Sequence, residues 1–169
     1  ADVDSYLGPE MKSTGEVMGS DHTFEKALLK AFAGAKMELP LSGSVLLTIE
    51  HGDKESVLPL AKRFSSIGYQ LLATDGTAKF LQKHGLRVVP VAKLSEQETT
   101  EQNIQELIQT GKVQLVINTM GHDHAATSDG FRIRQLAIAH NVPLLTSLNT
   151  AQALVRALEN RTFATDALL

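Results

Sequence analysis

Residues 45–68 have the sequence VLLTIEHGDKESVLPLAKRFSSIG, which predicts a buried β-strand followed by an amphipathic helix. The strand is the apolar run 45–49, whose lack of polar alternation is typical of a strand covered on both faces. Asp53 is expected to cap the helix and Gly68 to end it. Between them, four apolar side chains recur at helical spacing and are predicted to face the core: Val57, Leu60, Ala61 and Phe64.

The pattern of strand and helix continues to the C-terminus. Further strands are predicted at 69–73, 87–91, 113–117 and 142–145, and further helices at 77–84, 100–110, 131–140 and 150–158. Parallel neighbouring strands need long crossover connections, and the segments between these strands are long enough to be helices. The sequence therefore predicts an α/β fold, with one doubly wound sheet of five parallel strands and helices on both faces.

The N-terminal region has a different pattern. Residues 1–19 show no sustained period, 22–35 predict a helix with Leu28 on its apolar face, and 36–43 predict a connector. The first residue is Ala1 rather than methionine, so we expect the chain to be cut from a longer protein. No segment has the pattern of a signal peptide or a membrane span, which predicts a soluble, cytoplasmic protein.

The composition of the 169 residues narrows the class of partner. Lysine and arginine number 16 and aspartate and glutamate 19, which leaves a net charge of −3. A protein that neutralises many phosphates is usually strongly basic, so we expect no nucleic acid as partner. The lack of a long apolar run leads us to expect no membrane either. The chain has no cysteine, and a domain of this size needs neither a disulfide nor a metal to complete its core.

The loops that follow the predicted strands suit an anion. Ligands of parallel α/β sheets bind where the strands end at their carboxyl termini, here at 50–54, 74–77, 92–93, 118–121 and 146–149. Gly76 would let a ligand approach the backbone, Thr77 would open a helix, and Lys54 and Lys93 would supply positive charge. The sequence therefore predicts a phosphate site, although each loop by itself also fits a simple cap or turn.

No constellation of residues predicts catalysis. The carboxylates near the strand ends each have an explanation as a cap or a loop residue, namely Asp53, Asp75, Asp123 and Asp129. The sequence has no nucleophile elbow, no Walker A loop and no dinucleotide fingerprint. The run His122-Asp123-His124 offers metal-binding groups, but adjacent side chains seldom converge and no third ligand is evident, so no metal is predicted. His51 either contacts a ligand or belongs to a turn.

Two sets of residues resemble a known family. Residues 7–19, LGPEMKSTGEVMG, closely resemble the segment that closes the second ATP-grasp half of carbamoyl phosphate synthetase large subunits. The motifs GDKE at 52–55, TDGT at 74–77 and INT at 117–119 are similar to the C-terminal regulatory domain of the same subunits, which has the methylglyoxal synthase-like fold. The resemblance implies the strand order 3-2-1-4-5. It also implies that 1–19 are the tail of the preceding ATP-grasp domain, 20–43 a helix and connector, and 44–169 the regulatory domain.

The resemblance further implies an allosteric role. Such a domain binds a nucleotide effector, with UMP as an inhibitor, and controls carbamoyl phosphate synthesis for pyrimidine and arginine biosynthesis. This segment would be non-catalytic and without a cofactor, whereas the parent enzyme is an ATP-dependent ligase that uses Mg or Mn. Its partners would be the rest of the large subunit and the glutaminase small subunit. The residues that match the effector positions are Lys54, Thr74, Gly76, Thr77, Lys93, Asn118 and Thr119.

The chain departs from the family pattern at three positions. Some relatives bind ornithine through a tyrosine and a threonine in the last strand loop, where this chain has Leu144 and retains Thr146. Met120 replaces a threonine and Gly130 replaces a serine. These departures weigh against activation by ornithine or by a purine nucleotide such as IMP, and they leave phosphoribosyl diphosphate as a substitute activator.

A lyase is the alternative from another class. Methylglyoxal synthase shares the fold and acts on dihydroxyacetone phosphate with an aspartate as base, and Asp129 matches one family aspartate. The main catalytic base of that enzyme would fall near 94–100, where this chain has only Glu96 and Glu98 as carboxylates. Because a general base must lie within hydrogen-bond reach of its proton, the missing aspartate favours the regulatory interpretation.

Overall fold

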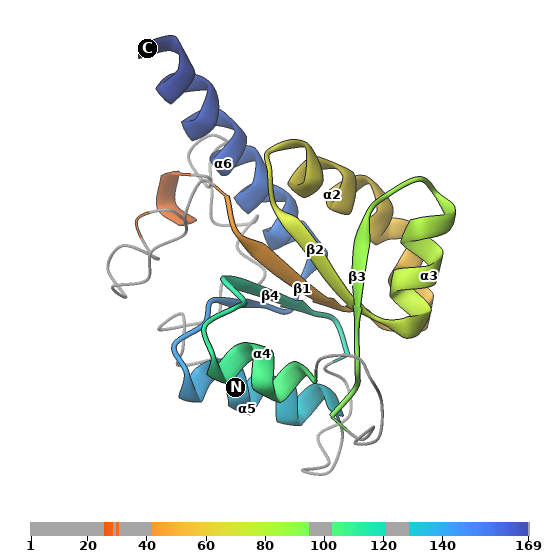
Figure 1. Cartoon of the computed structure of the whole chain (residues 1–169). Coiled ribbons are helices and arrows are strands. Elements are labelled where there is room, and N and C mark those ends of the chain that lie inside the picture. Colours follow the sequence, from red (N-terminus) through yellow and green to blue (C-terminus); the bar gives the residue numbers. More distant parts are fainter. Residues whose placement is uncertain (1–25, 29, 31–41, 95–102, 121–128, 169) are drawn as a thin grey trace.

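The computed structural model describes residues 26–28, 30, 42–94, 103–120 and 129–168. Its centre is a five-stranded sheet in the order β3-β2-β1-β4-β5, and every neighbouring pair of strands is parallel (Figure 1). The strands are β1 Ser44–Thr48, β2 Gln70–Thr74, β3 Val88–Val91, β4 Leu115–Asn118 and β5 Leu144–Leu145. Both the predicted fold class and the strand order implied by the resemblance are confirmed.

Helices cover both faces of this sheet. Figure 1 shows α4 and α5 on one face, and α2, α3 and α6 on the other. The bounds of the helical elements are η3 His51–Asp53, α2 Lys54–Ser66, α3 Asp75–Lys83, α4 Ile104–Gln109, α5 Asp129–Ala139 and α6 Leu148–Leu168. Residues 26–28 and 30 are also helical, and Leu28 is fully buried in the core.

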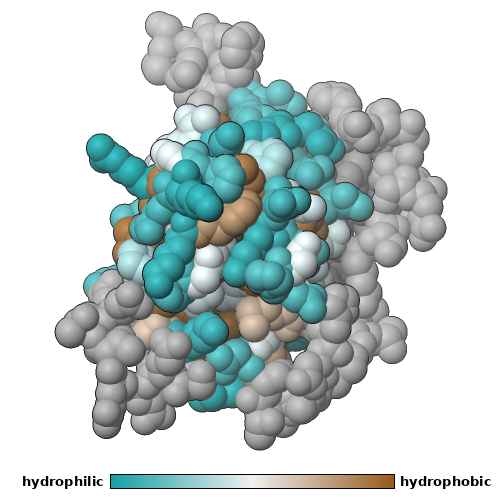
Figure 2. Space-filling model, turned by 90° about the vertical axis from the view of Figure 1, so that its right-hand side faces the viewer, coloured by the Kyte–Doolittle hydropathy of each residue, from teal (hydrophilic) through white to brown (hydrophobic). Residues whose placement is uncertain are grey.

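The core lies between the sheet and the two helix layers. Residues 45–48 of β1 are all buried, because helices cover both faces of the strand and leave no polar face. The predicted inner face of α2 is confirmed, since Val57, Leu60, Ala61 and Phe64 are its buried residues. Seen from the side of α3 and β3, the outer surface is mainly hydrophilic with scattered hydrophobic residues (Figure 2). Val89 in β3 is the one large hydrophobic residue exposed within the described part of the chain.

Some predicted boundaries are wrong. Asp53 does occupy the N-cap of α2, but its side chain makes no cap hydrogen bond, because a 3-10 turn over 51–53 leads into the helix. The helix predicted at 77–84 already begins at Asp75, and the strand predicted at 142–145 is limited to two residues. The last helix was predicted to end at Leu158 and continues to Leu168, since no glycine or proline follows to stop it.

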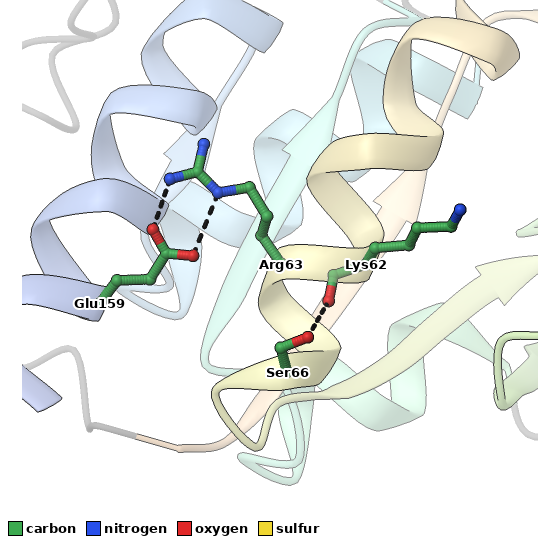
Figure 3. A network of polar contacts seen from close by, with 4 residues as sticks. All are labelled: Lys62, Arg63, Ser66 and Glu159. Atoms are coloured by element: carbon green, nitrogen blue, oxygen red, sulfur yellow. Dashed lines mark hydrogen bonds and ion pairs between the residues drawn. The ribbon is translucent and has the colours of Figure 1, made fainter. Parts of the chain in front are cut away.

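An ion pair ties α6 to α2. The Arg63 guanidinium contacts Glu159 through two nitrogens, and its Nε donates to Glu159 Oε2 at 3.1 Å (Figure 3). In the same view, Ser66 Oγ donates to the Lys62 carbonyl at 2.9 Å and closes the last turn of α2. The Arg63 and Glu159 side chains are 35% and 32% exposed, so we expect a contribution of at most about 1 kcal/mol.

Tyr69, which precedes β2, makes the stability of the fold depend on pH in the alkaline range. Its ring packs against Phe64 edge to face, with 5.4 Å between the centroids, and burial raises the pKa of Tyr69 to about 12 while Arg161 opposes the rise. The neutral phenol is therefore favoured in the folded state. Its contribution to stability is complete below the ordinary pKa of about 10 and is lost as the pH rises from about 10 to 12, by roughly 2–3 kcal/mol.

We therefore expect the free energy of unfolding to fall between pH 9 and 11.5 and to fall less in Tyr69→Phe. Urea unfolding at each pH, followed by circular dichroism, measures the difference. The chain has two tyrosines, so ultraviolet titration of both proteins also identifies the late phenolate. Parallel pH profiles in the two proteins would contradict the raised pKa.

Candidate functional site

A pocket of about 690 Å³ opens where β1, β2, β3 and β4 end. Its walls come from the segment after β1 with η3, the start of α2, the end of β2 with the start of α3, Lys93 after β3, Met120 shortly after β4, and the start of α5. Parallel strands in neighbouring positions end at the same edge, which is why residues far apart in the chain meet here. The volume is in the range of pockets that hold small organic ligands.

The lining of the pocket carries hydroxyl groups and positive charge. Lys54 is the first residue of α2, and Lys93 follows β3 as an exposed side chain. Thr74 occupies the N-cap of α3 without a side-chain cap hydrogen bond, and Thr77 lies in the first turn. The first backbone N–H groups of α3 therefore keep the partial positive charge of a helix N-terminus at this wall. Five of the residues predicted from the sequence line this pocket: Lys54, Thr74, Gly76, Thr77 and Lys93.

Because Gly76 has no side chain, there is room for the Lys54 ammonium beside it. A Cβ on Gly76 would lie 2.9 Å from Lys54 Nζ, so the lysine ammonium occupies the space that any other residue would fill. The same ammonium lies 3.4 Å from Nδ1 of His51 in η3. The positive charge is thus held directly over the N-terminal turn of α3.

Asn118 lies behind the pocket wall. It is fully buried and does not belong to the lining, and its amide is used inside the protein. Its Oδ1 accepts hydrogen bonds from Thr48 Oγ1 at 3.0 Å and from the Met120 N–H at 3.1 Å. Its Nδ2 donates to the Gly130 carbonyl at 3.0 Å. Asn118 therefore joins β1, the loop after β4 and the start of α5.

Thr119 also supports the wall. Its Oγ1 accepts from the Glu50 N–H at 2.9 Å, and its own N–H donates to the Thr48 carbonyl at 3.0 Å. Neither Thr119 nor Thr146, which follows β5, belongs to the lining residues. The two predicted effector residues at the end of β4, Asn118 and Thr119, therefore lie outside the pocket lining, and so does Thr146.

The lining of the pocket also includes carboxylates and apolar groups. Asp129 opens α5 with 18% of its side chain exposed, and Arg132 Nη1 lies 3.9 Å from Asp129 Oδ1. Ile49, Glu50 and Met120 also line the pocket and were not among the predicted site residues, although the loops predicted to bind a ligand, 50–54 and 118–121, contain Glu50 and Met120. The available signal was their position directly at the strand ends.

Several candidate groups fall outside the described residues. They are His122, Asp123 and His124 of the considered metal site, and Glu96 and Glu98 of the alternative lyase. Within the described ranges, no group of three or more histidine, aspartate or glutamate side chains is arranged to hold a metal ion. No described helix has both the length and the apolar character that crossing a membrane requires.

Comparison with known proteins identifies the family. The family model of the MGS-like domain matches residues 56–146, which is more than half of the chain. Among solved structures, methylglyoxal synthase from Elizabethkingia anophelis NUHP1 is similar with a TM-score of 0.51 and 16% sequence identity. The match covers 69% of this chain and 79% of that one, and at this identity it supports the fold alone. With five parallel strands, helices on both faces and this match, the chain belongs to the MGS-like domain family.

Proposed function

We propose that the chain is the regulatory domain of a carbamoyl phosphate synthetase large subunit and binds a nucleotide effector such as UMP. One observation carries the proposal: two lysines, two threonines and a glycine from three separate segments, at or after the ends of β1, β2 and β3, line a single pocket of about 690 Å³. The likeness of residues 7–19 to the end of an ATP-grasp domain supports the assignment to the large subunit. In this proposal 1–19 belong to that preceding domain, 20–43 connect it, and 44–169 form the effector-binding domain.

The effector phosphate binds at the start of α3. Lys54 and Lys93 supply positive charge, and Thr74 and Thr77 supply hydroxyl donors beside the backbone N–H groups of the first helical turn. Charge-assisted hydrogen bonds of this kind are about twice as strong as neutral ones. A helix N-terminus adds its partial positive charge, so the phosphate meets donors on several sides.

The remainder of the pocket accepts the organic part of the effector. Ile49 and Met120 provide apolar surface in the lining of the pocket. A phosphate alone leaves most of 690 Å³ empty, whereas a nucleoside monophosphate has a sugar and a base to fill it. IMP and phosphoribosyl diphosphate are further candidates, because they present the same phosphate with a different organic part.

Regulation follows if the effector binds two states of the parent enzyme with different affinity. Such a difference is typically worth about 1–3 kcal/mol, or roughly 5- to 150-fold in affinity. The effector would act on the rest of the large subunit and the glutaminase subunit, where ATP and Mg or Mn take part in carbamoyl phosphate synthesis. The domain itself supplies binding rather than a reaction step.

A lyase acting on dihydroxyacetone phosphate is the second candidate. The observation in its favour is that Asp129 and Glu50 line the same pocket as the two lysines. A carboxylate beside a bound triose phosphate is the arrangement that proton abstraction requires. Turnover of dihydroxyacetone phosphate that disappears in Asp129→Asn would support this reaction over regulation.

Replacing Lys54 tests the proposed function. We expect Lys54→Met to weaken UMP binding by about 10- to 100-fold, because one charge-assisted hydrogen bond worth about 1.5–3 kcal/mol is lost. Titration calorimetry with UMP, IMP and phosphoribosyl diphosphate measures the affinities. Lys62→Met is the matched control, since Lys62 is an exposed lysine of the same helix outside the pocket. Unchanged UMP affinity in Lys54→Met would refute the site.

Gly76→Ala tests how the lysine is positioned. The new methyl group would lie 2.9 Å from Lys54 Nζ, which is the flexible end of a side chain and moves aside at little cost to the fold. We expect an unchanged melting temperature and a UMP affinity reduced about five-fold, because the ammonium is displaced from the phosphate. Gly52→Ala is the control, since its Cβ would have no neighbour within 4 Å. Equal affinities in the two variants would contradict this role of Gly76.

A further inference from the structure

His51 stands next to the positive charge of the pocket and has no part in the function proposed so far. It begins η3, lines the pocket and is exposed, so a ligand can reach its ring. Its Nδ1 lies 3.4 Å from Lys54 Nζ. An ammonium group only donates hydrogen bonds, so Nδ1 must accept and the ring proton of the neutral imidazole lies on Nε2.

The charges around His51 explain why its protonation matters. The described lining residues include two ammonium groups, Lys54 and Lys93, and two carboxylates, Glu50 and Asp129, and these charges cancel. Of the nearby acids outside the lining, Asp53 shares the turn with His51, and Asp75 at the start of α3 is paired with Lys79 at 3.2 Å. A phosphate dianion therefore enters a pocket whose lining has no net charge while His51 is neutral.

We propose that His51 is a phosphate-binding residue that takes up a proton when a phosphate dianion binds. This inference rests on the proposed function, because it assigns the dianion to the same pocket. Before the phosphate binds, the neutral ring accepts a hydrogen bond from Lys54 and holds the ammonium over Gly76. When the phosphate binds, the Lys54 ammonium donates its hydrogen bonds to the phosphate and no longer to His51. Nδ1 is then free to bind a proton from solvent, and the imidazolium becomes the third cation at the ligand.

The consequence is selectivity for a terminal phosphate. A phosphomonoester carries close to two negative charges at neutral pH and a phosphodiester only one, so the monoester gains more from a third cation. Imidazole changes its charge between pH 5 and 8, which puts the effect in the physiological range. His51 would thus favour nucleoside monophosphates over their esters.

The test compares the wild-type chain with His51→Gln. Glutamine keeps an oxygen that accepts a hydrogen bond from Lys54 but cannot take up a proton. UMP and its methyl ester, a phosphodiester, are titrated calorimetrically between pH 6 and 8.5, each in two buffers of different ionisation enthalpy. The phosphate of UMP itself loses charge near pH 6, and the ratio of the two proteins' affinities removes this shared effect.

The expected result is a ratio of UMP affinities, wild type over His51→Gln, that rises about ten-fold from pH 8.5 to pH 6. The wild type should also take up more protons on binding than the variant, and the methyl ester should show a smaller rise. Equal proton uptake and a constant ratio would overturn the role of His51 and leave the proposed function intact. Absence of UMP binding by the wild-type chain would overturn the proposed function itself.

Discussion

Gly130→Ala is expected to destabilise the fold by about 3 kcal/mol or more. A Cβ at this buried position would lie 1.7 Å from the Met120 carbonyl oxygen and 2.8 Å from its carbon. Both atoms belong to the backbone, so no side chain can rotate away. Either the loop after β4 or the start of α5 must move, and overpacking of this kind costs about 1–3 kcal/mol and occasionally more.

Urea unfolding measures the loss, with Gly52→Ala as the control. The control methyl group would have no neighbour within 4 Å, and we expect its effect to stay within about 0.5–1 kcal/mol. Gly130 and Met120 both line the pocket, so we also expect Gly130→Ala to lose UMP affinity while the control keeps it. A stability within 1 kcal/mol of the wild type would mean that α5 does not begin against this loop.

The close contact also connects two departures from the family pattern. Met120 stands where the resemblance implies a threonine, and Gly130 where it implies a serine. The Met120 Cβ would lie 3.2 Å from a Cβ on Gly130, so the two positions are in direct contact. The glycine is required here because the Met120 backbone approaches α5 so closely.

Asn118→Leu is expected to cost about 3–5 kcal/mol. Leucine has a similar size but no polar atoms, so three groups lose their hydrogen bond to Asn118: Thr48 Oγ1, the Met120 N–H and the Gly130 carbonyl. Thr48 Oγ1 keeps only its longer hydrogen bond to the Ile117 carbonyl, at 3.5 Å. Each buried polar group left without a partner costs about 1–3 kcal/mol, and the groups next to the pocket retain some access to water.

Asn103→Leu is the comparison for this prediction. The Asn103 side chain caps α4 by accepting from the Gln105 N–H at 2.8 Å, and this bond lies at the surface. We expect about 1 kcal/mol for the loss of such a cap. Urea unfolding of both variants gives the two values. A loss at Asn118 no larger than the loss at Asn103 would show that the buried amide does not hold the wall together.

Measuring both stability and effector binding in the Asn118 variant distinguishes direct contact with the effector from a positioning role. The resemblance implies that Asn118 contacts the effector, whereas in the structure its amide bonds with the protein. A positioning role predicts that binding and stability fall together, while direct contact predicts a loss of binding in variants that remain stable. Thr119→Val extends the comparison, since it removes only the hydrogen bond from the Glu50 N–H.

The sequence alone was sufficient to predict which strands and helices follow one another along the chain. The unbroken apolar run at 45–49 and the helical spacing of Val57, Leu60 and Phe64 are local signals, and local periodicity determines whether a segment buries one face or two. Helices also stop where predicted at Gly68 and Gly85, which have φ angles of +100° and +88° that few other residues adopt. The pocket lysines and threonines were found for a topological reason, since parallel strands bring their carboxyl ends together.

Only the tertiary structure decided which of these residues face the pocket. Successive side chains of a strand point to opposite faces of the sheet, so a shift of one residue in register would change which face Asn118 occupies. The observed register pairs Asn118 of β4 with Thr48 of β1, and the Asn118 amide bonds with the Thr48 hydroxyl inside the protein. The requirement for glycine at 130 and the contact between His51 and Lys54 arise in the same way, from loops that meet only when the chain is folded. Periodicity in the sequence carries no information on such contacts, because their distances depend on how separate elements pack.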